Sequence, residues 1–585
     1  MKLTEEQRNA VAEPGHVCLV SCPGSGKTRA IVAKLLRCIE SVALSPRHVA
    51  CITHTNAAAD EIDSRLRQLC FGEEDRHYEV ATIHAFALQN ILTPFHHYLP
   101  ELADGFTVLT SDSDEYTEKC NELLLRYGLN MGSSEGFERI TRNTDGSIRP
   151  LDTLPFELQE EWCRWLDENA FITFADMLYH AGRLVVGYPH IAGALASRFA
   201  WILIDEFQDT SAGQILIFDE IHRYGRTNFF CVGDPNQSIY RFAGASPELL
   251  TNFAASIHAN TAHRLSGNFR SSARIVTLAE RLCPTNPAMQ AVGEYSHFPF
   301  QPIHHQVATP LAGILDEFLP AVEQLNVSLG EVAILAPWWT TLYALGRQLR
   351  AHGIPIIGPG ARPYKRTHQI AQLLEALGAY VEDADADSAI AVQRSLFILL
   401  TGISDRAAHN VFSFHGRVVV CRILSEARVA RAASPIAVNW IADVTQRIAH
   451  VLAGFDVPAS VNPAIQESAA AMTNDISERD GGNALTVSDL GIFGRPKDCI
   501  QLLTVHKAKG REFEAVAIID AHDGRFPYYK VQHIPDPVER AAQYDEARRV
   551  LYVAATRAKR VLMFFTDTTH HMNRPSPFLH EMHLV

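Results

Sequence analysis

The sequence predicts an α/β fold built on parallel β-sheets. Three short apolar runs support this prediction, because each ends in polar residues of a kind that could form a site. The runs are Val17–Val20, which leads through a glycine-rich turn into a helix over Thr28–Ile39; Ala200–Ile204, which ends in two carboxylates; and Phe229–Val232, which ends in a Gly-Asp pair. Ligands of open parallel sheets bind at the carboxyl ends of the strands, so these strand ends are where we expect a site.

The turn after the first run has the sequence SCPGSGKT at 21–28. Glycines let backbone N–H groups approach phosphates closely, and a helix N-terminus adds partial positive charge. In this context Lys27 would reach the β- and γ-phosphates of a nucleotide, and the Thr28 hydroxyl would ligate Mg²⁺. Ser21 stands where the strict pattern has glycine. The alternative is a tight turn before an ordinary helix, but the order of strand, loop and helix favours a phosphate site.

The other two strand ends offer the remaining chemistry of phosphoryl transfer. Asp205 and Glu206 could divide the tasks of holding Mg²⁺ and orienting water, although two solvated acids would look the same in sequence. After the third run, Gln237 could sense the γ-phosphate. Tyr240 and Phe242 follow closely and could stack on bases, or could equally belong to a core.

Composition bounds the class of protein. The 585 residues are several times a typical domain, and 47% of them are hydrophobic and 20% charged, as in ordinary globular proteins. The formal net charge of −14 gives no sign of nucleic-acid binding, so any such contact must come from a local channel. The eleven cysteines form no pair of CxxC clusters, which argues against zinc or iron–sulfur sites. We expect a reduced, cytoplasmic protein without a membrane partner.

Eight segments together resemble the signature of superfamily 1A DNA helicases of the UvrD/Rep/PcrA family. They are LTEEQ at 3–7, THTNAAA at 53–59, TIHAF at 82–86, DEFQDT at 205–210, GDPNQSIY at 233–240, NFRS at 268–271, TVHKAKGREF at 504–513 and VAATRAK at 553–559. A single such segment is weak, whereas this number in this order along the chain is very specific. The resemblance implies two RecA-like motor domains with parallel sheets, each carrying a mainly helical insertion.

The resemblance also implies ATP and Mg²⁺ as cofactors and assigns residues to them. The nucleotide residues would be Gln7 on adenine, Pro23, Gly24, Ser25, Gly26, Lys27 and Thr28 on the phosphates, Arg29 and Phe269 on the base faces, and Glu512 on the ribose. The metal would be held by Thr28 and Asp205. The catalytic group would be Lys27, Asp205, Glu206 as base, and Gln237, Arg270 and Arg557 on the γ-phosphate.

For DNA, the resemblance implies a track through Thr53, Asn56, His84, Tyr240, Phe242 and His506. His54 stands where the family often has Phe, and Ala243 where it often has Arg, so base stacking and phosphate contact could differ here. Arg511 replaces a usual Leu. For each histidine, a purely structural role is as good an interpretation as a functional one.

The family layout predicts four domains. Motor domain 1A would comprise residues 1–91 and 173–244, with insertion 1B at 92–172; motor domain 2A would comprise 245–370 and 491–585, with a reduced helical insertion 2B at 371–490. The acidic run Glu382–Asp387 is linker-like in composition, and we favour a solvated face as its interpretation. Because the chain ends soon after the last motif, we expect neither a nuclease domain nor a long tail.

The leading hypothesis is an ATP-dependent 3′–5′ translocase or helicase on single-stranded DNA or a 3′-tailed duplex. The compact 2B region leaves open an ATPase or DNA-sensing subunit of a nuclease–helicase anti-phage complex, like the GajB type that works beside an OLD-type nuclease. A non-catalytic DNA scaffold is the third hypothesis, and it is opposed by the chemically suitable residue at every catalytic position.

Overall fold

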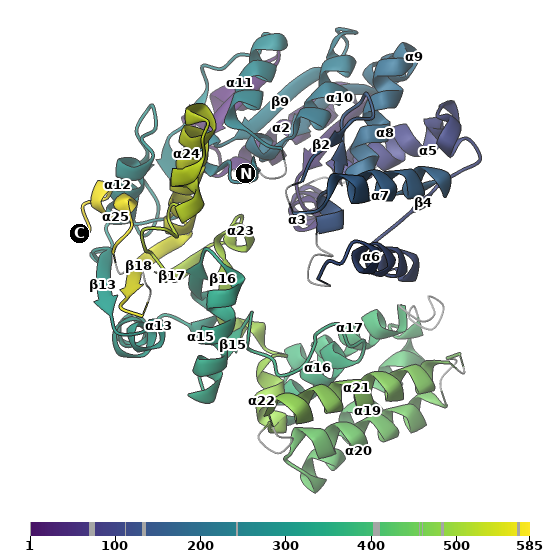
Figure 1. The fold of residues 1–585 in the computed structure, drawn as a ribbon, viewed down its shortest axis with the longest axis vertical. Coiled ribbons are helices and arrows are strands. Elements are labelled where there is room, and N and C mark those ends of the chain that lie inside the picture. The colour runs from purple at the N-terminus through teal and green to yellow at the C-terminus, as the bar shows by residue number, and fades with distance from the viewer. Residues whose placement is uncertain are drawn as a thin grey trace. The chain divides into compact units, whose positions relative to one another are not determined.

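The structure is a computed structural model (Figure 1). It describes residues 2–69, 77–111, 113–130, 136–151, 153–241, 244–401, 410–454, 457–458, 460–480, 485–569 and 574–585. The chain divides into two compact units, the first comprising Met1–Val276 and Cys283–His297, and the second Thr277–Leu282 and Phe298–Val585. Each unit is described by itself.

The first unit is built on a six-stranded parallel sheet in the order β10-β1-β9-β8-β2-β3. Its strands are β1 (Val17–Ser21), β2 (His48–Thr53), β3 (Tyr78–Thr82), β8 (Phe199–Ile204), β9 (Asn228–Gly233) and β10 (Arg264–Leu265). Because neighbouring strands run parallel, β1, β8 and β9 all end at the same edge of the sheet. The three apolar runs singled out in the sequence are therefore adjacent strands.

Helices cover both faces of this sheet, which explains why its strands are apolar on both sides. Alternate strand residues such as Leu19 and Leu203 pack with α2 and α3, whereas Cys18 and Ile202 pack with helices of the opposite face. The helices are α1 (Glu5–Ala12), α2 (Lys27–Val42), α3 (Asn56–Arg67), α4 (Ile83–Ala87), α5 (Thr93–Phe95), α8 (Phe174–Gly187), α9 (Pro189–Arg198), α10 (Ala212–His222) and α11 (Pro247–Ser256).

The first insertion has a small core of its own around Trp162. It contains α6 (Asp114–Arg126), α7 (Phe156–Glu168), the two-stranded sheet of β4 (Thr107–Val108) and β7 (Phe171–Ile172), and the antiparallel pair β5 (Thr141–Arg142) and β6 (Ile148–Arg149). The last two strands form a short hairpin.

The second unit contains another six-stranded parallel sheet, ordered β13-β18-β17-β14-β16-β15. Its strands are β13 (Ile303–Val307), β14 (Val332–Ala336), β15 (Ile356–Ile357), β16 (Ile500–Thr504), β17 (Phe513–Ile518) and β18 (Ala558–Asp567). The accompanying helices include α13 (Pro310–Ala312), α14 (Leu319–Gln324), α15 (Trp339–Ala351), α23 (Val505–Ala508), α24 (Pro537–Ala555) and α25 (Pro577–Glu581).

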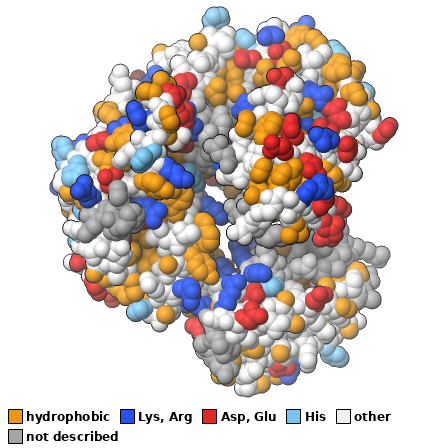
Figure 2. Space-filling view, viewed as in Figure 1, with side chains coloured by type: hydrophobic (Ala, Val, Ile, Leu, Met, Phe, Trp, Pro, Cys, Tyr) orange, Lys and Arg blue, Asp and Glu red, His pale blue; other side chains and the backbone are white. Residues whose placement is uncertain are grey.

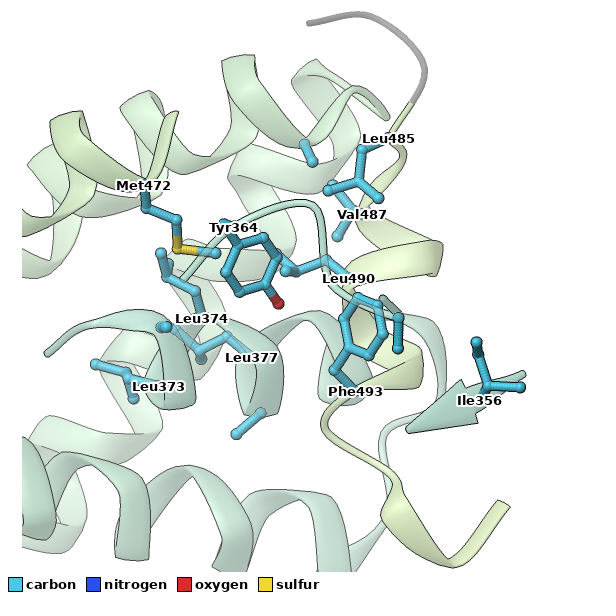
Figure 3. Packing of buried hydrophobic residues seen from close by; sticks show 14 of the residues in the cluster. Ile356, Tyr364, Leu373, Leu374, Leu377, Met472, Leu485, Val487, Leu490 and Phe493 are labelled. Carbon is cyan, nitrogen blue, oxygen red and sulfur yellow. The ribbon is translucent and has the colours of Figure 1, made fainter. Parts of the chain in front are cut away.

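A helical bundle interrupts this second sheet between β15 and β16. It comprises α16 (Ala371–Glu382), α17 (Ala386–Thr401), α19 (Phe414–Ala433), α20 (Ala437–Leu452), α21 (Val461–Asp480) and α22 (Val487–Ile492). One continuous apolar core joins the bundle to the sheet, and Figure 3 shows Tyr364 and Phe493 within it. The acidic run is not a linker between domains, because only a short exposed turn separates α16 from α17.

The predicted α/β class is confirmed, with two parallel sheets and abundant helices. Residues 245–276 and 283–297, which the sequence analysis places in the second motor domain, lie in the first unit. The physical reason is that β10 pairs with β1 and α11 packs on the first sheet's core. The elements between β10 and β13 are β11 (Gly267–Asn268), α12 (Ala273–Leu282) and β12 (Gln290–Ala291).

No helix among the described residues has the length and apolarity to cross a bilayer.

Candidate active site and nucleic-acid interface

The glycine-rich turn between β1 and α2 is held in a conformation that requires its glycines. Gly24 and Gly26 have φ of 68° and 78°, in the left-handed region that disfavours other residues. A Cβ on Gly24 would lie 2.6 Å from the Cβ of Arg270, and a Cβ on Gly26 would lie 2.8 Å from the Gln7 amide nitrogen. The turn therefore brings two predicted nucleotide residues against its backbone.

Gln7 is fixed from both sides. Its side chain and Thr4 form a reciprocal cap at the start of α1, and its Nε2 donates to the carbonyl oxygen of Ser25 at 3.0 Å. The side chain is almost fully buried. An amide in this position ties the N-terminal helix to the phosphate loop.

Lys27, at the start of α2, meets the carboxylate pair at the end of β8. Its Nζ lies 3.3 Å from Glu206, and Gln208 Nε2 donates to the same carboxylate at 2.6 Å. The other end of the Gln208 amide accepts the backbone N–H of Asp234 at 2.9 Å. Asp234 in turn accepts from Gln237 Nε2 at 2.7 Å. This chain of bonds connects the ends of β1, β8 and β9.

Glu206 itself adopts φ 48° and ψ 42°, an unusual backbone conformation for a residue with a side chain. Its N–H donates to the Asp205 carboxylate at 2.9 Å, which stabilises the turn locally. The strained turn directs consecutive carboxylates to different partners. It is a feature that the sequence alone does not reveal.

Burial and crowding set the charge states of this cluster. Burial, followed by the charge of Glu206, raises the pKa of Asp205 to about 7. Burial likewise raises the pKa of Asp234. Burial opposes the charge of Lys27, but the carboxylates of Glu206, Asp234 and Asp205 outweigh it and raise the pKa of the lysine. Three carboxylates thus surround one ammonium group.

The residues present fit a magnesium nucleotide. The excess of buried carboxylate suits a hard divalent cation, and the Thr28 hydroxyl stands at the first turn of α2. The Ser25 hydroxyl is buried and has no hydrogen-bond partner among the described residues, which suits a phosphate oxygen. When bound, Mg²⁺ would neutralise phosphate charge. Thr28 and Asp205 are the groups that would hold it.

Residues 268–271 lie against the phosphate loop within the same unit. The Phe269 N–H donates to the Gly24 carbonyl at 2.8 Å, and the Asn268 carboxamide oxygen accepts the N–H groups of Arg270 and Ser271. The Phe269 ring is 43% exposed, and Arg29 is also exposed. These two side chains are thus available to pack on the faces of a base.

Three of the predicted site residues belong to the second unit. Arg557 is buried and donates to the carbonyl oxygens of Val553 and Arg511. Glu512 is partly exposed and lies 3.2 Å from the Lys559 ammonium. His506 is on the short helix α23, immediately after β16. Each is therefore held by its own unit, at or near a strand end.

A groove of about 640 Å³ runs within the first unit between the sheet and the β5–β6 hairpin. His84 and Tyr240, both predicted for DNA, line it together with His54, whose ring stacks on Tyr240 at 5.6 Å. Arg149 and Arg241 also line it. Burial, and then the charge of His54, lowers the pKa of His84 to about 4, so His84 is neutral at neutral pH.

The other predicted DNA residues have different positions. Thr53 is buried and donates to the Thr55 carbonyl at 3.0 Å, so it presents no hydroxyl at the surface. Asn56 is exposed at the first turn of α3. Phe242 and the neighbouring Ala243 lie outside the described residues.

Sequence reasoning missed three residues that the structure brings to these sites. Gln208 bridges the carboxylates, Asn268 orders the 268–271 turn, and Phe174 lies edge-on to His84 at 5.8 Å while 55% exposed. Gln208 and Asn268 stand inside quoted motifs, so polarity at a buried strand end was an available signal. Phe174 had no such signal, because an exposed aromatic at a helix start is not distinctive in sequence.

Comparison with known proteins decides the family. The UvrD/REP helicase N-terminal domain matches residues 3–258, and the UvrD-like helicase C-terminal domain matches residues 482–568. The chain belongs to the UvrD/Rep family of superfamily 1A helicases. It is accordingly an ATP-dependent DNA helicase by class, and the strand-end cluster lies within the matched N-terminal domain.

Relatives of this helicase align along almost all of it. DNA helicase II of Escherichia coli (strain K12) is 24% identical over 646 residues, covering 99% of the chain and 87% of the relative. DNA helicase II of Rickettsia typhi is 22% identical, with 99% and 95% covered. ATP-dependent DNA helicase UvrD1 of Mycobacterium tuberculosis is 23% identical, with 96% and 81% covered. The helicase is thus similar to these proteins in extent as well as in motifs.

Proposed function

We propose that this helicase moves 3′ to 5′ along single-stranded DNA, and that the cluster at the ends of β1, β8 and β9 hydrolyses the ATP that drives it. The observation that carries the proposal is the bonded chain from Lys27 through Glu206, Gln208 and Asp234 to Gln237. A solvated surface pair of acids would not be linked in this way to a phosphate loop and to the next strand end.

The residues divide the chemistry by position. Lys27 and the loop N–H groups bind phosphate oxygens, while Asp205 and Thr28 would hold the cation. In the nucleotide-bound state Glu206, released from Lys27 by the phosphates, accepts the proton of the attacking water. Gln237, held by Asp234, orients toward the γ-phosphate, and Arg270 and Arg557 neutralise charge in the transition state.

The DNA strand, in this proposal, follows the groove of the first unit. His84 and Tyr240 offer ring faces there, and Phe174 adds a further exposed ring. Arg149 and Arg241 supply positive charge for phosphates. Because His84 is neutral at neutral pH, its contact is a stacking or hydrogen-bonding contact rather than an ion pair. Asn56 and His506 are proposed to extend the track.

The first test is ATP hydrolysis by the full chain with and without single-stranded DNA. We expect strong stimulation by DNA and no turnover in Lys27→Ala. The matched control is Lys497→Ala, which removes an exposed lysine that lies outside all the motif segments. Turnover that ignores DNA would point to a regulated subunit of a larger complex, and normal turnover in Lys27→Ala would overturn the site.

Polarity needs a separate measurement. Strand displacement is followed on duplexes that carry either a 3′ or a 5′ single-stranded tail of equal length and sequence. The proposal expects unwinding from the 3′-tailed duplex. Efficient unwinding from only the 5′-tailed duplex would reverse the polarity while leaving the ATPase assignment intact.

A further inference from the structure

Five aromatic residues of the second unit form a surface that no part of the proposed chemistry uses. Trp338, Trp339, Tyr343, Tyr528 and Tyr529 are here named the aromatic surface. Trp339 is 59% exposed and Tyr529 46%, and ring contacts join Trp338 to Tyr528 at 5.1 Å and Trp339 to Tyr343 at 6.1 Å. Clustered exposed aromatics, unlike single ones, indicate an interaction site.

The aromatic surface stands at the carboxyl edge of the second sheet. Ala336, the last residue of β14, pairs with Thr504, the last residue of β16. Trp338 lies two residues after the end of β14, and His506, which is proposed to contact DNA, lies two residues after the end of β16. The loop that follows β17, on the other side of β14, leads to Tyr528. The loops that carry the aromatics and His506 therefore leave three neighbouring strands at the same edge of the sheet.

Positive charge accompanies the rings. Arg347 is exposed one turn beyond Tyr343, which is itself one turn beyond Trp339, so these three share one side of α15. Lys507 and Lys530 are exposed next to His506 and Tyr529. Figure 2 shows basic side chains gathered over the part of the second unit between β15 and α16. Aromatic faces among basic groups match single-stranded nucleic acid, whose bases stack and whose phosphates are anionic.

The local sequence also contradicts helix-start rules. Trp338 is the N-cap of α15 and makes no side-chain capping bond, where Ser, Thr, Asp or Asn would stabilise the helix by about 1 kcal/mol. Two consecutive tryptophans at an exposed helix start thus serve neither the cap nor the core. Residues that break a local rule without structural gain mark functional positions.

We propose that the aromatic surface is a base-stacking platform for single-stranded DNA on the second motor unit, with Trp339 and Tyr343 as its principal rings. The proposal rests on the proposed function, because it adds a second contact region to the same DNA track. It names residues that lie outside all eight motif segments. Stacking on them tolerates any base, as a translocating motor requires.

The test compares the affinity of the full chain for two oligonucleotides, one of ordinary thymidine nucleotides and one of equal length made of abasic units. We expect Trp339→Ala and Tyr343→Ala each to weaken binding of the ordinary strand by about five- to 150-fold, the range for loss of one stacked base. Both variants should bind the abasic strand as the unaltered chain does. Trp339→Phe should restore most of the affinity.

Phe414→Ala is the matched control, because Phe414 is an 82% exposed aromatic on the helical bundle, and this variant should bind both strands normally. Unchanged unfolding midpoints would show that each variant folds. Tryptophan fluorescence gives an independent signal, since quenching by DNA should diminish in Trp339→Phe although binding persists.

Each other outcome is decisive. If Trp339→Ala and Tyr343→Ala bind the ordinary strand normally while the unaltered chain binds DNA well, the platform is wrong and the proposed function stands. An equal loss on both strands would mean backbone contact and would also overturn stacking. Loss of a co-purifying protein with normal DNA affinity would assign the surface to a protein partner instead. If the unaltered chain binds no single-stranded DNA, the proposed function itself fails.

Discussion

Both sheets of this helicase have six parallel strands, but they differ in strand order and in the side chains at their carboxyl edges. In the first unit the strand ends carry carboxylates and amides that are bonded to one another and to Lys27. In the second unit the ends of β14 and β16 lead to exposed tryptophans and to a histidine. The ends of parallel strands thus carry a bonded network around Lys27 in one unit, and exposed ring faces at the ends of β14 and its neighbours in the other.

The difference teaches that the parallel sheet fixes where a site lies and not what it does. The first edge is a closed network in which each polar group depends on the next, as phosphoryl transfer requires. The second edge has a bonded group of its own, in which His522 lies 3.2 Å from Asp567 and Thr341 donates to Asp520 at 3.1 Å, and it also carries the exposed rings of the aromatic surface. In our proposals, the residues at the first edge hydrolyse ATP, and the aromatic surface at the second edge binds single-stranded DNA.

Replacing Glu206, the predicted general base, should have the largest effect, because it should abolish most ATP hydrolysis without changing DNA binding. Glu206→Gln keeps the size of the side chain but removes its proton-accepting charge, so hydrolysis should fall by about 100- to 10,000-fold. Steady-state phosphate release measures this, and binding of a fluorescent ATP analogue checks that the nucleotide still binds. Glu40→Gln, an exposed glutamate on α2, is the control. Single-stranded DNA affinity should not change, and turnover within a few-fold of normal would remove Glu206 from the mechanism.

Each unit also anchors its insertion with a buried arginine, and this pair gives the second prediction. Arg142 donates to Asp167 and Asp176 at 2.7 to 3.0 Å, whereas Arg362 donates to Glu375, which also accepts from the Tyr364 hydroxyl at 2.8 Å. Arg142→Ala leaves Asp176 buried without its cation and should cost about 3–5 kcal/mol of local stability.

Hydrogen exchange of α8 and the β5–β6 hairpin measures this loss. Arg362→Ala should cost a similar amount, because Glu375 is as buried as Asp176 and each carboxylate keeps one hydroxyl donor, from Tyr364 and Thr173 respectively. The surface control is Arg126→Ala, whose solvent-exposed ion pairs should contribute little to stability. Equal effects of Arg142→Ala and Arg126→Ala would show that burial does not decide the strength of the anchor.

The contribution of His84 to the stability of the first unit should depend on pH. The pKa of His84 is lowered to about 4 by burial, whereas an unfolded histidine titrates near its ordinary pKa of about 6.5. Below pH 6.5, His84 becomes protonated in the unfolded chain but stays neutral in the folded chain. Lowering the pH from about 6.5 to 4 therefore favours unfolding. The contribution reaches up to about 3 kcal/mol and is absent above pH 6.5.

The difference between the unaltered chain and His84→Asn isolates this effect from other groups. Denaturant unfolding of both is measured between pH 7 and pH 4, and the stability advantage of the unaltered residue should shrink as the pH falls. Parallel curves for the two proteins would mean that His84 is solvated and free to protonate, and its proposed neutral contact with DNA would be wrong.

The sequence was sufficient to predict the two parallel sheets and to propose a site at the strand ends, because apolar runs followed by glycine or acidic residues are local signals. It did not reach the assignment of residues 245–276 to the first unit, since the short strand β10 has too little apolar sequence to reveal its pairing with β1. The left-handed turn at Glu206 could not be predicted either, because the side chain of Glu206 is bonded to Lys27, which is distant in sequence, as well as to Gln208 of the same turn. The site assignments themselves stay predictions.

The smallest effect concerns the residue that joins the first edge together. Gln208→Ala removes the donor to Glu206 and the acceptor for the Asp234 N–H, while every residue proposed to touch ATP remains. Because the change acts only through positioning, we expect hydrolysis to fall about tenfold, equivalent to about 1.4 kcal/mol, with little change in KM for ATP. Gln208→Glu should not restore the rate, because a carboxylate cannot donate to Glu206. A loss that appears mainly in KM would instead place Gln208 in nucleotide binding, and the first edge would then be a set of separate contacts rather than one connected network.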